Sequence, residues 1–528
     1  MLRVPYLVIL LLAPLLAQAG VNPRNGNFYV TYMDTTLSAK GHELALNRTY
    51  NSKSTKVGWF GFGWGSTFET YLTVMPDQSA VISENGSGAN TFYHDESTAR
   101  NKKQVAAGVG KIVAAAKAQD KLTSAAVKAL TKKLMESEED RLSAVIKYHV
   151  QSQLSPKLSL TAFGRGYCAG KLFRTDSGYT RDNGCGTVDD FDAQGHLIRH
   201  SQNDGDDGYQ FSLNFESGHP VEIVDSDGQS IHLSWTEEGQ VSRITDSEGT
   251  TVTYKYDDFH NLTMANLLSG PFYRYDYDRN HNMTRIGYID GSSRFMTYNG
   301  NGAATSVTET NGERWLYEYA TAAGDPNKYT TRIREIAKDG SEKVQTQGFQ
   351  DAYSATGERY LENHSVEDEQ HDASTQFDKK GRVTSRKIRS GETLSYTYHP
   401  TLDKVIEVKV DGKFAARYQY SANGELIHAE DADGQATELK YDDKKHISEM
   451  YMSNADGSHD HLSLKYDECG KPVELKHAEL GVVKVQYDDK GEVRDAKSET
   501  EGRDGSRLAQ RIVKMFQNIL RLVRLAAV

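Results

Sequence analysis

The amino-acid sequence predicts a mainly β protein of tandem β-hairpins coiled into a curved ribbon or partial shell, with a helical insertion and a carboxy-terminal amphipathic helix. One observation behind this fold class is composition: the 528 residues include 30 tyrosines, only 10 prolines and 37% hydrophobic residues. Tyrosine suits half-buried strands because its ring packs while its hydroxyl reaches water. The other observation is a sequence repeat with a period of about 21 residues.

One aromatic residue marks each repeat unit, and seven of the thirteen spacings between these aromatics are identical, which chance would not produce. Glycines recur four residues and near fourteen residues after the aromatic, often as Asp-Gly, Glu-Gly or Asn-Gly. Such pairs tolerate turns with positive φ. Two turns per unit leave room for two strands, so each unit is expected to be one hairpin. The marking aromatics are Phe191, Phe215, Trp235, Tyr256, Tyr277, Tyr298, Tyr319, Tyr353, Phe377, Tyr398, Tyr420, Tyr441, Tyr466 and Tyr487.

The aspartate that often follows the aromatic is expected to start the turn by accepting hydrogen bonds from nearby backbone amides. Tyr256, Tyr277, Tyr441, Tyr466 and Tyr487 are therefore interpreted as structural residues. Their rings also suit stacking on sugars, but packing within the repeat is the favoured interpretation.

The first residues have the pattern of a secretory signal. Arg3 precedes an apolar run, Val4–Leu16, and Ala17-Gln18-Ala19 is a small-residue cleavage site. We expect the mature chain to begin at Gly20 and to be periplasmic, at the cell surface or secreted. A formal net charge of −11 gives no reason to expect nucleic-acid binding.

The chain has three cysteines, too few for disulfides to be its main framework. We expect Cys168 and Cys185, which lie 17 residues apart in a Gly-rich stretch, to form a disulfide. Cys469 is expected to be buried, because nothing basic surrounds it in the sequence to lower its pKa.

Two segments depart from the repeat. Residues 96–151 have helical spacing, with Gly108 and Gly110 expected to interrupt the first helix; Lys102–Lys133 holds eight lysines and one acid. This insertion has either a solvated lysine face or a partner-docking surface. Arg507–Val528 reads as a basic amphipathic helix that either caps the repeats, contacts an anionic membrane or a partner, or frays.

No catalytic or cofactor-binding fingerprint occurs in the sequence, so no catalytic residue, cofactor or metal site is predicted. His459 and His461 fall on one face of a strand, but without an identifiable third ligand they are interpreted as a hairpin rim. Carboxylates are too numerous for a catalytic acid pair to be chosen among them.

The repeat resembles the YD repeats of the Rhs and teneurin-like superfamily. "YDDKGEV" at Tyr487–Val493 and "FDKKGRVTS" at Phe377–Ser385 are similar to its core, and matching units cover about Phe191–Val493. "LNRTYNSKSTKVGWFGFGWGSTFETYL" at Leu46–Leu72 is similar to the module that precedes many Rhs repeats. The aromatic side chains of this module are expected to close one end of the sheet. They include Trp59, Phe60, Phe62 and Trp64.

The resemblance implies a β-shell that in some members encloses a carboxy-terminal toxin, released by self-cleavage near an Asp-Pro-x-Gly signature, and in others serves adhesion or carbohydrate association. The only Asp-Pro here is Asp325-Pro326, followed by Asn327, and only the short segment 494–528 follows Val493. We therefore expect a member without the toxin domain and without self-cleavage.

The favoured function is an exported, non-enzymatic scaffold that engages a glycan or protein partner at the cell envelope or outside. The alternatives are a β-shell that encapsulates a separately encoded polypeptide and, third, a glycan-active enzyme. The expected domains are a signal peptide (1–19), an aromatic and Gly-rich amino-terminal module (20–95), a helical insertion (96–151), a connecting β segment (152–190), the repeat array (191–498), and a linker with the basic helix (499–528).

Overall fold

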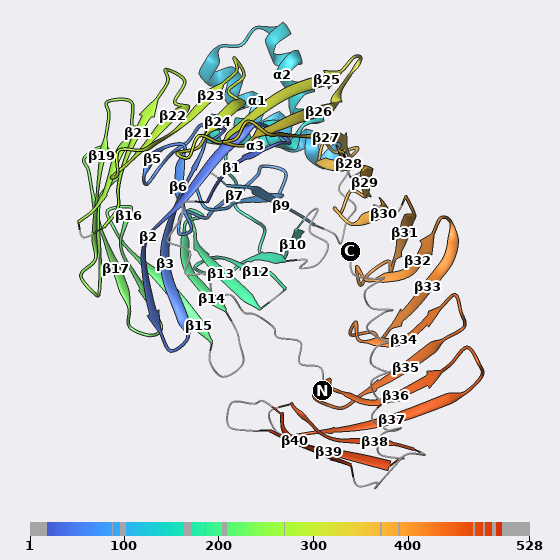
Figure 1. Ribbon diagram of the computed structural model, residues 1–528. Coiled ribbons are helices and arrows are strands. Elements are labelled where there is room, and N and C mark those ends of the chain that lie inside the picture. Colours follow the sequence, from blue (N-terminus) through green and yellow to red (C-terminus); the bar gives the residue numbers. More distant parts are fainter. Residues whose placement is uncertain are drawn as a thin grey trace. The chain divides into compact units, whose positions relative to one another are not determined.

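The computed structural model describes residue 510 and residues 18–498 except for short gaps, which are residues 87, 96–101, 163–169, 185, 203–207, 269, 370–371, 389–390, 468–469, 479–480 and 488–492. The chain divides into two compact units, residues 1–370 with 379–381, and residues 371–378 with 382–528. Both units consist mainly of antiparallel strands, and the first holds the three helices of the described residues (Figure 1).

The amino-terminal strands of the first unit form a small sheet of their own, which we call the plug (residues 18–66). Strands β1, β2, β3 and β6 pair in that order, and β4 pairs with β5. Burial alternates along β2 and β3, as expected for strands covered on one face. The strands are β1 Gln18–Asn22, β2 Asn27–Ala39, β3 His42–Asn51, β4 Val57–Gly58, β5 Gly61–Phe62 and β6 Trp64–Ser66.

From β7 onward, the first unit is an antiparallel ladder in which each strand pairs with the next in sequence. Strands β9 and β10 pair directly although the helices lie between them in sequence. The strands are β7 Tyr71–Val74, β8 Ala80–Ser83, β9 Asn90–His94, β10 Ser159–Ala162, β11 Lys171–Arg174, β12 Gly178–Asp182, β13 Thr187–Asp192, β14 Leu197–Gln202, β15 Tyr209–Glu216, β16 His219–Asp225, β17 Ser230–Trp235, β18 Val241–Asp246, β19 Thr251–Tyr256, β20 Leu262–Leu267, β21 Phe272–Tyr277, β22 Met283–Tyr288, β23 Ser293–Tyr298, β24 Ala304–Thr308, β25 Arg314–Ala322, β26 Asp325–Ile336, β27 Glu342–Tyr353 and β28 Arg359–Asp368.

The helical insertion contains α1 (Lys102–Asp120), α2 (Ser124–Glu136) and α3 (Glu138–Lys147). The prediction that Gly108 and Gly110 interrupt the first helix is wrong, because α1 runs through both. A Cβ on Gly108 would lie 2.7 Å from the Cβ of Asp77, so this glycine lets the helix approach the β7–β8 turn. The apolar faces of α1 and α3 pack on Met75 and Val81.

A β-bulge recurs in the repeat hairpins. Trp235, Tyr256, Tyr277 and Tyr298 are each the last residue of a strand, and the pairing register shifts immediately before each. A bulge bends its strand and increases the local twist. Because the bulges recur with the repeat, they bend the sheet in the same sense along the first unit (Figure 1).

In several repeats, the turn after the marking aromatic is closed by the side chain that follows it. The Oδ1 atom of Asp257 accepts hydrogen bonds from the amides of Phe259 and Asn261 at 3.0 and 2.8 Å. Asp278, at the same position of the next repeat, accepts two such bonds from the amides of Asn280 and Asn282. The expected role of this aspartate is therefore confirmed in these turns.

The plug covers the inner side of the repeat sheet. In Figure 1, β2, β3 and β6 run inside the curve of β15–β24. Buried plug residues such as Phe28 and Leu46 belong to one core cluster with Ile223, Ile244 and Ile286 of the repeats. The inner face of these hairpins is thus packed against protein.

The second unit is a similar ladder of hairpins, and a bulge again precedes Tyr398, Tyr420 and Tyr441. Its buried residues form two smaller clusters, around Val408 and around Met450. The expected mainly β fold of tandem hairpins is confirmed. The strands are β29 Asp372–Phe377, β30 Val383–Lys387, β31 Thr393–Tyr398, β32 Val405–Val410, β33 Lys413–Tyr420, β34 Leu426–Asp431, β35 Ala436–Tyr441, β36 Ile447–Ser453, β37 His459–Tyr466, β38 Pro472–His477, β39 Gly481–Tyr487 and β40 Val493–Ser498.

Several expectations fall on residues that the structure does not describe. These are the apolar run of the signal, the Cys168–Cys185 disulfide, the burial of Cys469 and, apart from residue 510, the basic helix Arg507–Val528. Gln18 and Ala19 of the expected cleavage site are described, and they pair with Thr31 and Val30 in β1.

Candidate functional site

The repeat tyrosines link neighbouring hairpins. The hydroxyl of Tyr256 donates to the carbonyl of Val241 at 2.6 Å, and that of Tyr277 donates to Leu262 at 2.9 Å, each 15 residues back. In the second unit, the hydroxyls of Tyr441, Tyr466 and Tyr487 donate to Leu426, Ile447 and Pro472 at 2.7, 2.8 and 2.9 Å. Burial raises the pKa of all five phenols.

The four aromatic residues singled out in the amino-terminal module contact the repeat sheet in different ways. Trp59 meets Trp235 edge-on at 5.7 Å between ring centroids, and Phe60 meets Tyr254 at 5.0 Å. Phe62 stacks on His281 at 3.9 Å. Trp64 is fully buried, and its Nε1 donates to the Tyr277 hydroxyl at 2.9 Å.

The plug also satisfies backbone amides next to the bulges of successive repeats. The amide of Val241 donates to the carbonyl of Trp59 at 2.7 Å, and that of Ala304 donates to Gly26 at 2.9 Å. Between them, the amide of Met283 donates to the hydroxyl of Tyr50 at 3.0 Å. The plug is therefore fixed to the repeats through their backbone as well as through its core.

An ion pair lies in the middle of this interface. Arg48 is fully buried and donates to both carboxylate oxygens of Asp34, at 2.7 and 3.0 Å. The hydroxyl of Tyr254 donates to the same carboxylate at 2.8 Å. Burial disfavours the charged guanidinium, but the Asp34 carboxylate outweighs it and holds the pKa of Arg48 above its usual value. These groups are engaged with one another, which is the arrangement of a structural ion pair.

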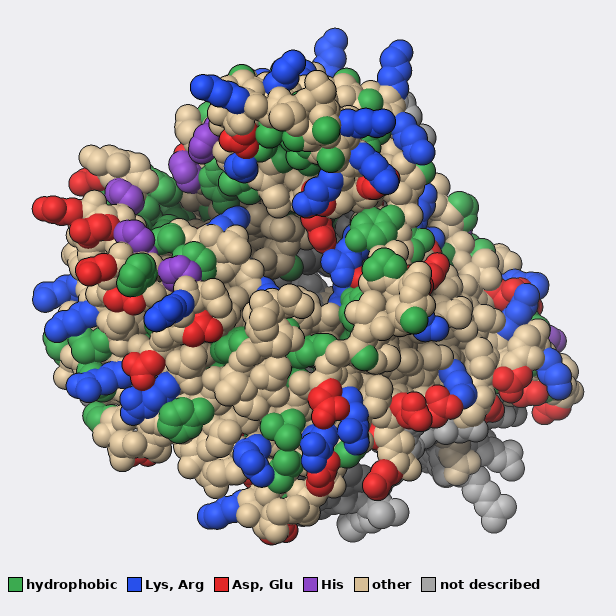
Figure 2. All heavy atoms as spheres, turned by 90° about the horizontal axis from the view of Figure 1, so that it is seen from above, with side chains coloured by type: hydrophobic (Ala, Val, Ile, Leu, Met, Phe, Trp, Pro, Cys, Tyr) green, Lys and Arg blue, Asp and Glu red, His purple; other side chains and the backbone are tan. Residues whose placement is uncertain are grey.

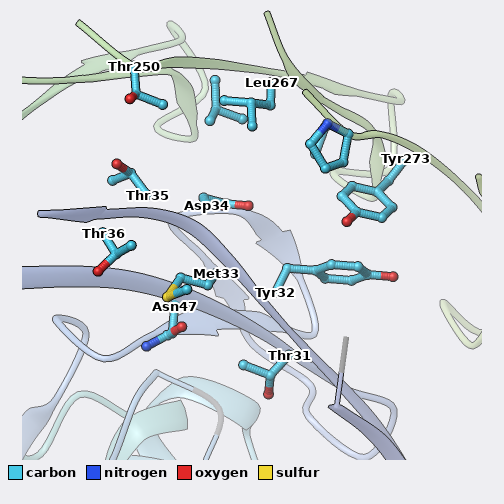
Figure 3. A pocket seen from close by; sticks show the side chains of 13 residues that line it. Thr31, Tyr32, Met33, Asp34, Thr35, Thr36, Asn47, Thr250, Leu267 and Tyr273 are labelled. Carbon is cyan, nitrogen blue, oxygen red and sulfur yellow. The ribbon is translucent and has the colours of Figure 1, made fainter. Parts of the chain in front are cut away.

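A cavity of about 560 Å³ opens beside this ion pair, between β2 of the plug and β19–β21 of the repeats (Figure 3). Its size falls in the usual range for small-ligand sites, roughly 300–1,000 Å³. Threonine hydroxyls and the Asn47 amide line one part, and apolar side chains with the Tyr273 ring line the other. Such a surface suits a ligand with both hydroxyl groups and apolar faces. The lining residues are Thr31, Tyr32, Met33, Asp34, Thr35, Thr36, Asn47, Thr250, Val252, Ala265, Leu267, Pro271 and Tyr273.

The helical insertion presents a basic surface. Every lysine between Lys102 and Lys133 is exposed, while Asp120 is the only acid in that range. Figure 2 views the molecule from the side on which Figure 1 shows the helices, and Lys and Arg side chains project there. This local positive charge contrasts with the net charge of −11 of the whole chain.

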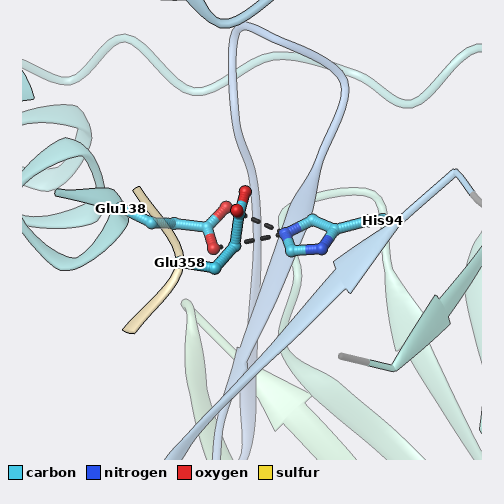
Figure 4. Close-up of side chains that lie close together, drawn as sticks. All are labelled: His94, Glu138 and Glu358. Atoms are coloured by element: carbon cyan, nitrogen blue, oxygen red, sulfur yellow. Dashed lines mark hydrogen bonds and ion pairs between the residues drawn. The ribbon is translucent and has the colours of Figure 1, made fainter. Parts of the chain in front are cut away.

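A third feature is a buried cluster of His94, Glu138 and Glu358 (Figure 4). The Nε2 atom of His94 lies 2.9 and 3.2 Å from the two carboxylate oxygens of Glu138. One donor atom from each of the three residues lies within 4.8 Å of the other two. Sequence reasoning missed this cluster, because its members come from three distant parts of the chain.

The two histidines considered as a metal pair do not form such a cluster in the described residues. His461 stacks on Tyr451 at 4.2 Å between ring centroids, and His459 contacts the hydroxyl of Ser453 at 3.1 Å. Among the helices that the structure describes, none is long and apolar enough to cross a membrane.

Three family models match parts of the chain. They are a domain of unknown function (DUF6531) over residues 18–92, the RHS Repeat over residues 235–266 and the Teneurin YD-shell over residues 328–504. The first match spans the plug and the first strands of the ladder. No curated protein matches the chain.

Among solved structures, that of TcdB2-TccC3-Cdc42 matches at 12% identity with a TM-score of 0.31, covering 90% of this chain and 28% of that chain. TcdB2-TccC3 without its hypervariable C-terminal region matches at 11% identity and a TM-score of 0.30, covering 94% and 28%. A porin-like protein from Bacteroides uniformis matches at 11% identity and a TM-score of 0.16, covering 54% and 91%. The chain thus spans less than a third of the length of the TcdB2-TccC3 chains.

Proposed function

Because the chain is an RHS/YD-repeat protein, we propose that it is an exported, non-enzymatic scaffold that binds a glycan or protein partner at the cell envelope or outside. The observation that carries this proposal is the filled inner side of the repeats in the first unit, where plug and repeats share one core. A filled sheet leaves its cavities and exposed surfaces for binding, whereas a container needs an interior void.

The cavity between plug and repeats is the proposed glycan site. Sugars combine hydroxyl groups with apolar ring faces, and aromatic rings and amide side chains are suitable partners for them. Asn47 of the plug and Tyr273 of β21 are both among the residues that line the cavity. The lining therefore offers a sugar both an amide group and an aromatic ring.

Glycan binding is tested by applying the purified protein to a glycan array and titrating any ligand found by calorimetry. Asn47→Ala and Tyr273→Ala should each weaken binding by about tenfold, the value of one lost polar or stacking contact. Asn301→Ala is the matched control, because Asn301 lies in an exposed turn outside the cavity. Equal binding by all four proteins would remove the cavity from the proposal.

A protein partner is instead expected at the basic surface of the helical insertion. Oppositely charged surfaces attract over about 8 Å at physiological salt, so an acidic partner is favoured there. Capture of a co-secreted protein should weaken as salt is raised, and replacing Lys111, Lys128 and Lys132 by Gln should reduce it. The replacement of Lys413 and Lys471, which lie in the second unit, is the control.

Encapsulation of a separately encoded polypeptide is the second candidate, favoured by the Teneurin YD-shell match over residues 328–504. A co-expressed polypeptide that copurifies and resists added protease until the protein is unfolded would support it.

Release of fragments from a glycan during incubation would contradict the non-enzymatic part of the proposal. The basic segment Arg507–Val528 is proposed to contact either an anionic membrane or the repeats, and binding to anionic vesicles distinguishes the two.

A further inference from the structure

Three segments of the first unit meet at the buried cluster of His94, Glu138 and Glu358. His94 is the last residue of β9, Glu138 is the first residue of α3, and Glu358 immediately precedes β28. Each belongs to a different part of the fold: the first strands of the ladder, the helical insertion and the repeat hairpin of β27 and β28. Whatever fills this cluster also joins these parts.

The three side chains point toward one another (Figure 4). Their relative exposures are 9% for His94, 2% for Glu138 and 4% for Glu358. Burial removes water from the two carboxylates, and a cation held between them would compensate for that loss.

The surrounding contacts hold the two carboxylates in place. The amide of Glu138 donates to the carbonyl of Gly357 at 3.0 Å, which fixes α3 against the turn that carries Glu358. The hydroxyl of Thr356 donates to the Oε2 of Glu358 at 2.5 Å. Arg141 donates to the Thr356 carbonyl at 2.9 Å, and its Nη2 lies 3.6 Å from the Oε1 of Glu138. Oriented carboxylates of this kind are typical of metal sites.

We propose that His94, Glu138 and Glu358 bind a divalent transition-metal ion, for which Zn²⁺ is the probe. One imidazole and two carboxylates suit Zn²⁺, which takes such ligands at about 2.0–2.2 Å. The donor atoms, within 4.8 Å of one another, need only a small convergence to surround an ion at that distance. The metal clamps the helical insertion onto the repeat array, as a structural ion rather than a reacting one.

A proton is the competing occupant. Without a metal, the Arg141 guanidinium is one positive charge beside these carboxylates. Metal and proton compete for the same atom, because Nε2 must be deprotonated to bind Zn²⁺. A cluster that is a metal site therefore binds added zinc, whereas a cluster held together by protons and cationic side chains does not.

The test uses the full chain, freed of metal with a chelator and titrated with ZnCl₂ by calorimetry. We expect one site that Glu358→Gln and His94→Gln weaken by at least about tenfold. His461→Gln is the matched control, because the chain has 17 histidines and surface histidines also bind zinc. Zinc at a hundredfold excess over the Kd should raise the melting temperature of the wild type by about 4 °C.

A second measurement covers the case in which the variants fail to fold. Co²⁺ added to the wild type should give the visible absorption of an ion with imidazole and carboxylate ligands, and one equivalent of Zn²⁺ should abolish it. The proposal is overturned if wild type and His94→Gln bind zinc equally. It is also overturned if the wild type gives no cobalt spectrum that zinc displaces.

Discussion

Most repeat tyrosines donate their hydroxyl to a carbonyl of a preceding strand, and Tyr277 takes part in a second bond as well. Its oxygen accepts from the Nε1 of Trp64 in the plug while it donates to Leu262. Tyr298 makes the same interstrand bond, to Met283 at 2.9 Å, without the bond to the plug. The two residues are therefore a natural pair for comparison.

Tyr277→Phe should lower the free energy of unfolding more than Tyr298→Phe does. Loss of the Tyr277 hydroxyl leaves a buried indole N–H and a buried carbonyl without a partner, which costs about 2–4 kcal/mol, against about 1–2 kcal/mol for the single bond of Tyr298. Urea denaturation followed by circular dichroism measures both. Equal losses would mean that the plug bond to Tyr277 contributes nothing.

Glu69 predicts a pH dependence. Its carboxylate accepts hydrogen bonds from the amides of Trp59 and Ser66, both at 2.7 Å. Burial raises the pKa of Glu69 to about 8, although these hydrogen bonds lower it. The unfolded chain ionises this group near pH 4.5. Between these two pH values the folded state holds one more proton, so the free energy of unfolding falls as the pH rises.

The slope from this single group is at most about 1.4 kcal/mol per pH unit. Urea midpoints at pH 5, 6.5 and 8 should decrease for the wild type and decrease less for Glu69→Gln, which cannot ionise. Glu318→Gln, at an exposed position, should keep the slope of the wild type. A slope unchanged by Glu69→Gln would contradict the raised pKa.

The structural roles of the repeat tyrosines and of the aspartates after them could be predicted from the sequence, because these residues form their contacts within one hairpin or with the neighbouring hairpin. It predicted that the aromatic side chains of the module would pack, but not which residues they would meet. The Arg48–Asp34 ion pair was not predicted, because Asp34 lies 14 residues away on a neighbouring strand. The cluster of His94, Glu138 and Glu358 carries no local signal at all.

At the scale of elements, the bulge at the repeated aromatic is what turns a ladder of hairpins into a curved sheet. The spacing of tyrosine and glycine predicted the hairpins, because turn chemistry is local. It did not predict the bulges, which become evident only in the pairing of one strand with the next. The predicted break in α1 failed for the same reason, because a glycine demanded by tertiary packing looks in the sequence like a helix breaker.

Gly108 and Gly110 should respond in opposite ways to the same substitution. A Cβ added to Gly110 would have no atom within 4 Å, so Gly110→Ala should stabilise α1 by up to about 1 kcal/mol through helix propensity. Gly108→Ala would place its Cβ 2.7 Å from the Cβ of Asp77, and should destabilise the docking of the helix despite the same gain in propensity. Thermal unfolding followed by far-ultraviolet circular dichroism compares the two variants, and a shift of the same sign in both would contradict the close approach.

At the scale of the whole molecule, the two compact units differ in how much core each possesses. The first unit combines the large cluster between plug and repeats with two others, whereas the second has only two small clusters in its described residues. Because burial of apolar surface is the main source of stability, the second unit should unfold at a lower temperature. Calorimetry should then resolve two transitions.

Two substitutions assign these transitions. Trp64→Ala removes a fully buried ring from the plug, costs about 3–5 kcal/mol and should lower only the upper transition. Gly434→Ala changes the turn at Asp433-Gly434 in the second unit, where an added Cβ has no atom within 4 Å. The substitution forces alanine to φ +79°, which costs about 1 kcal/mol. It should lower only the transition at the lower temperature. If each variant moves both transitions together, the two units unfold as one, and the assignment of a separate stability to each core is wrong.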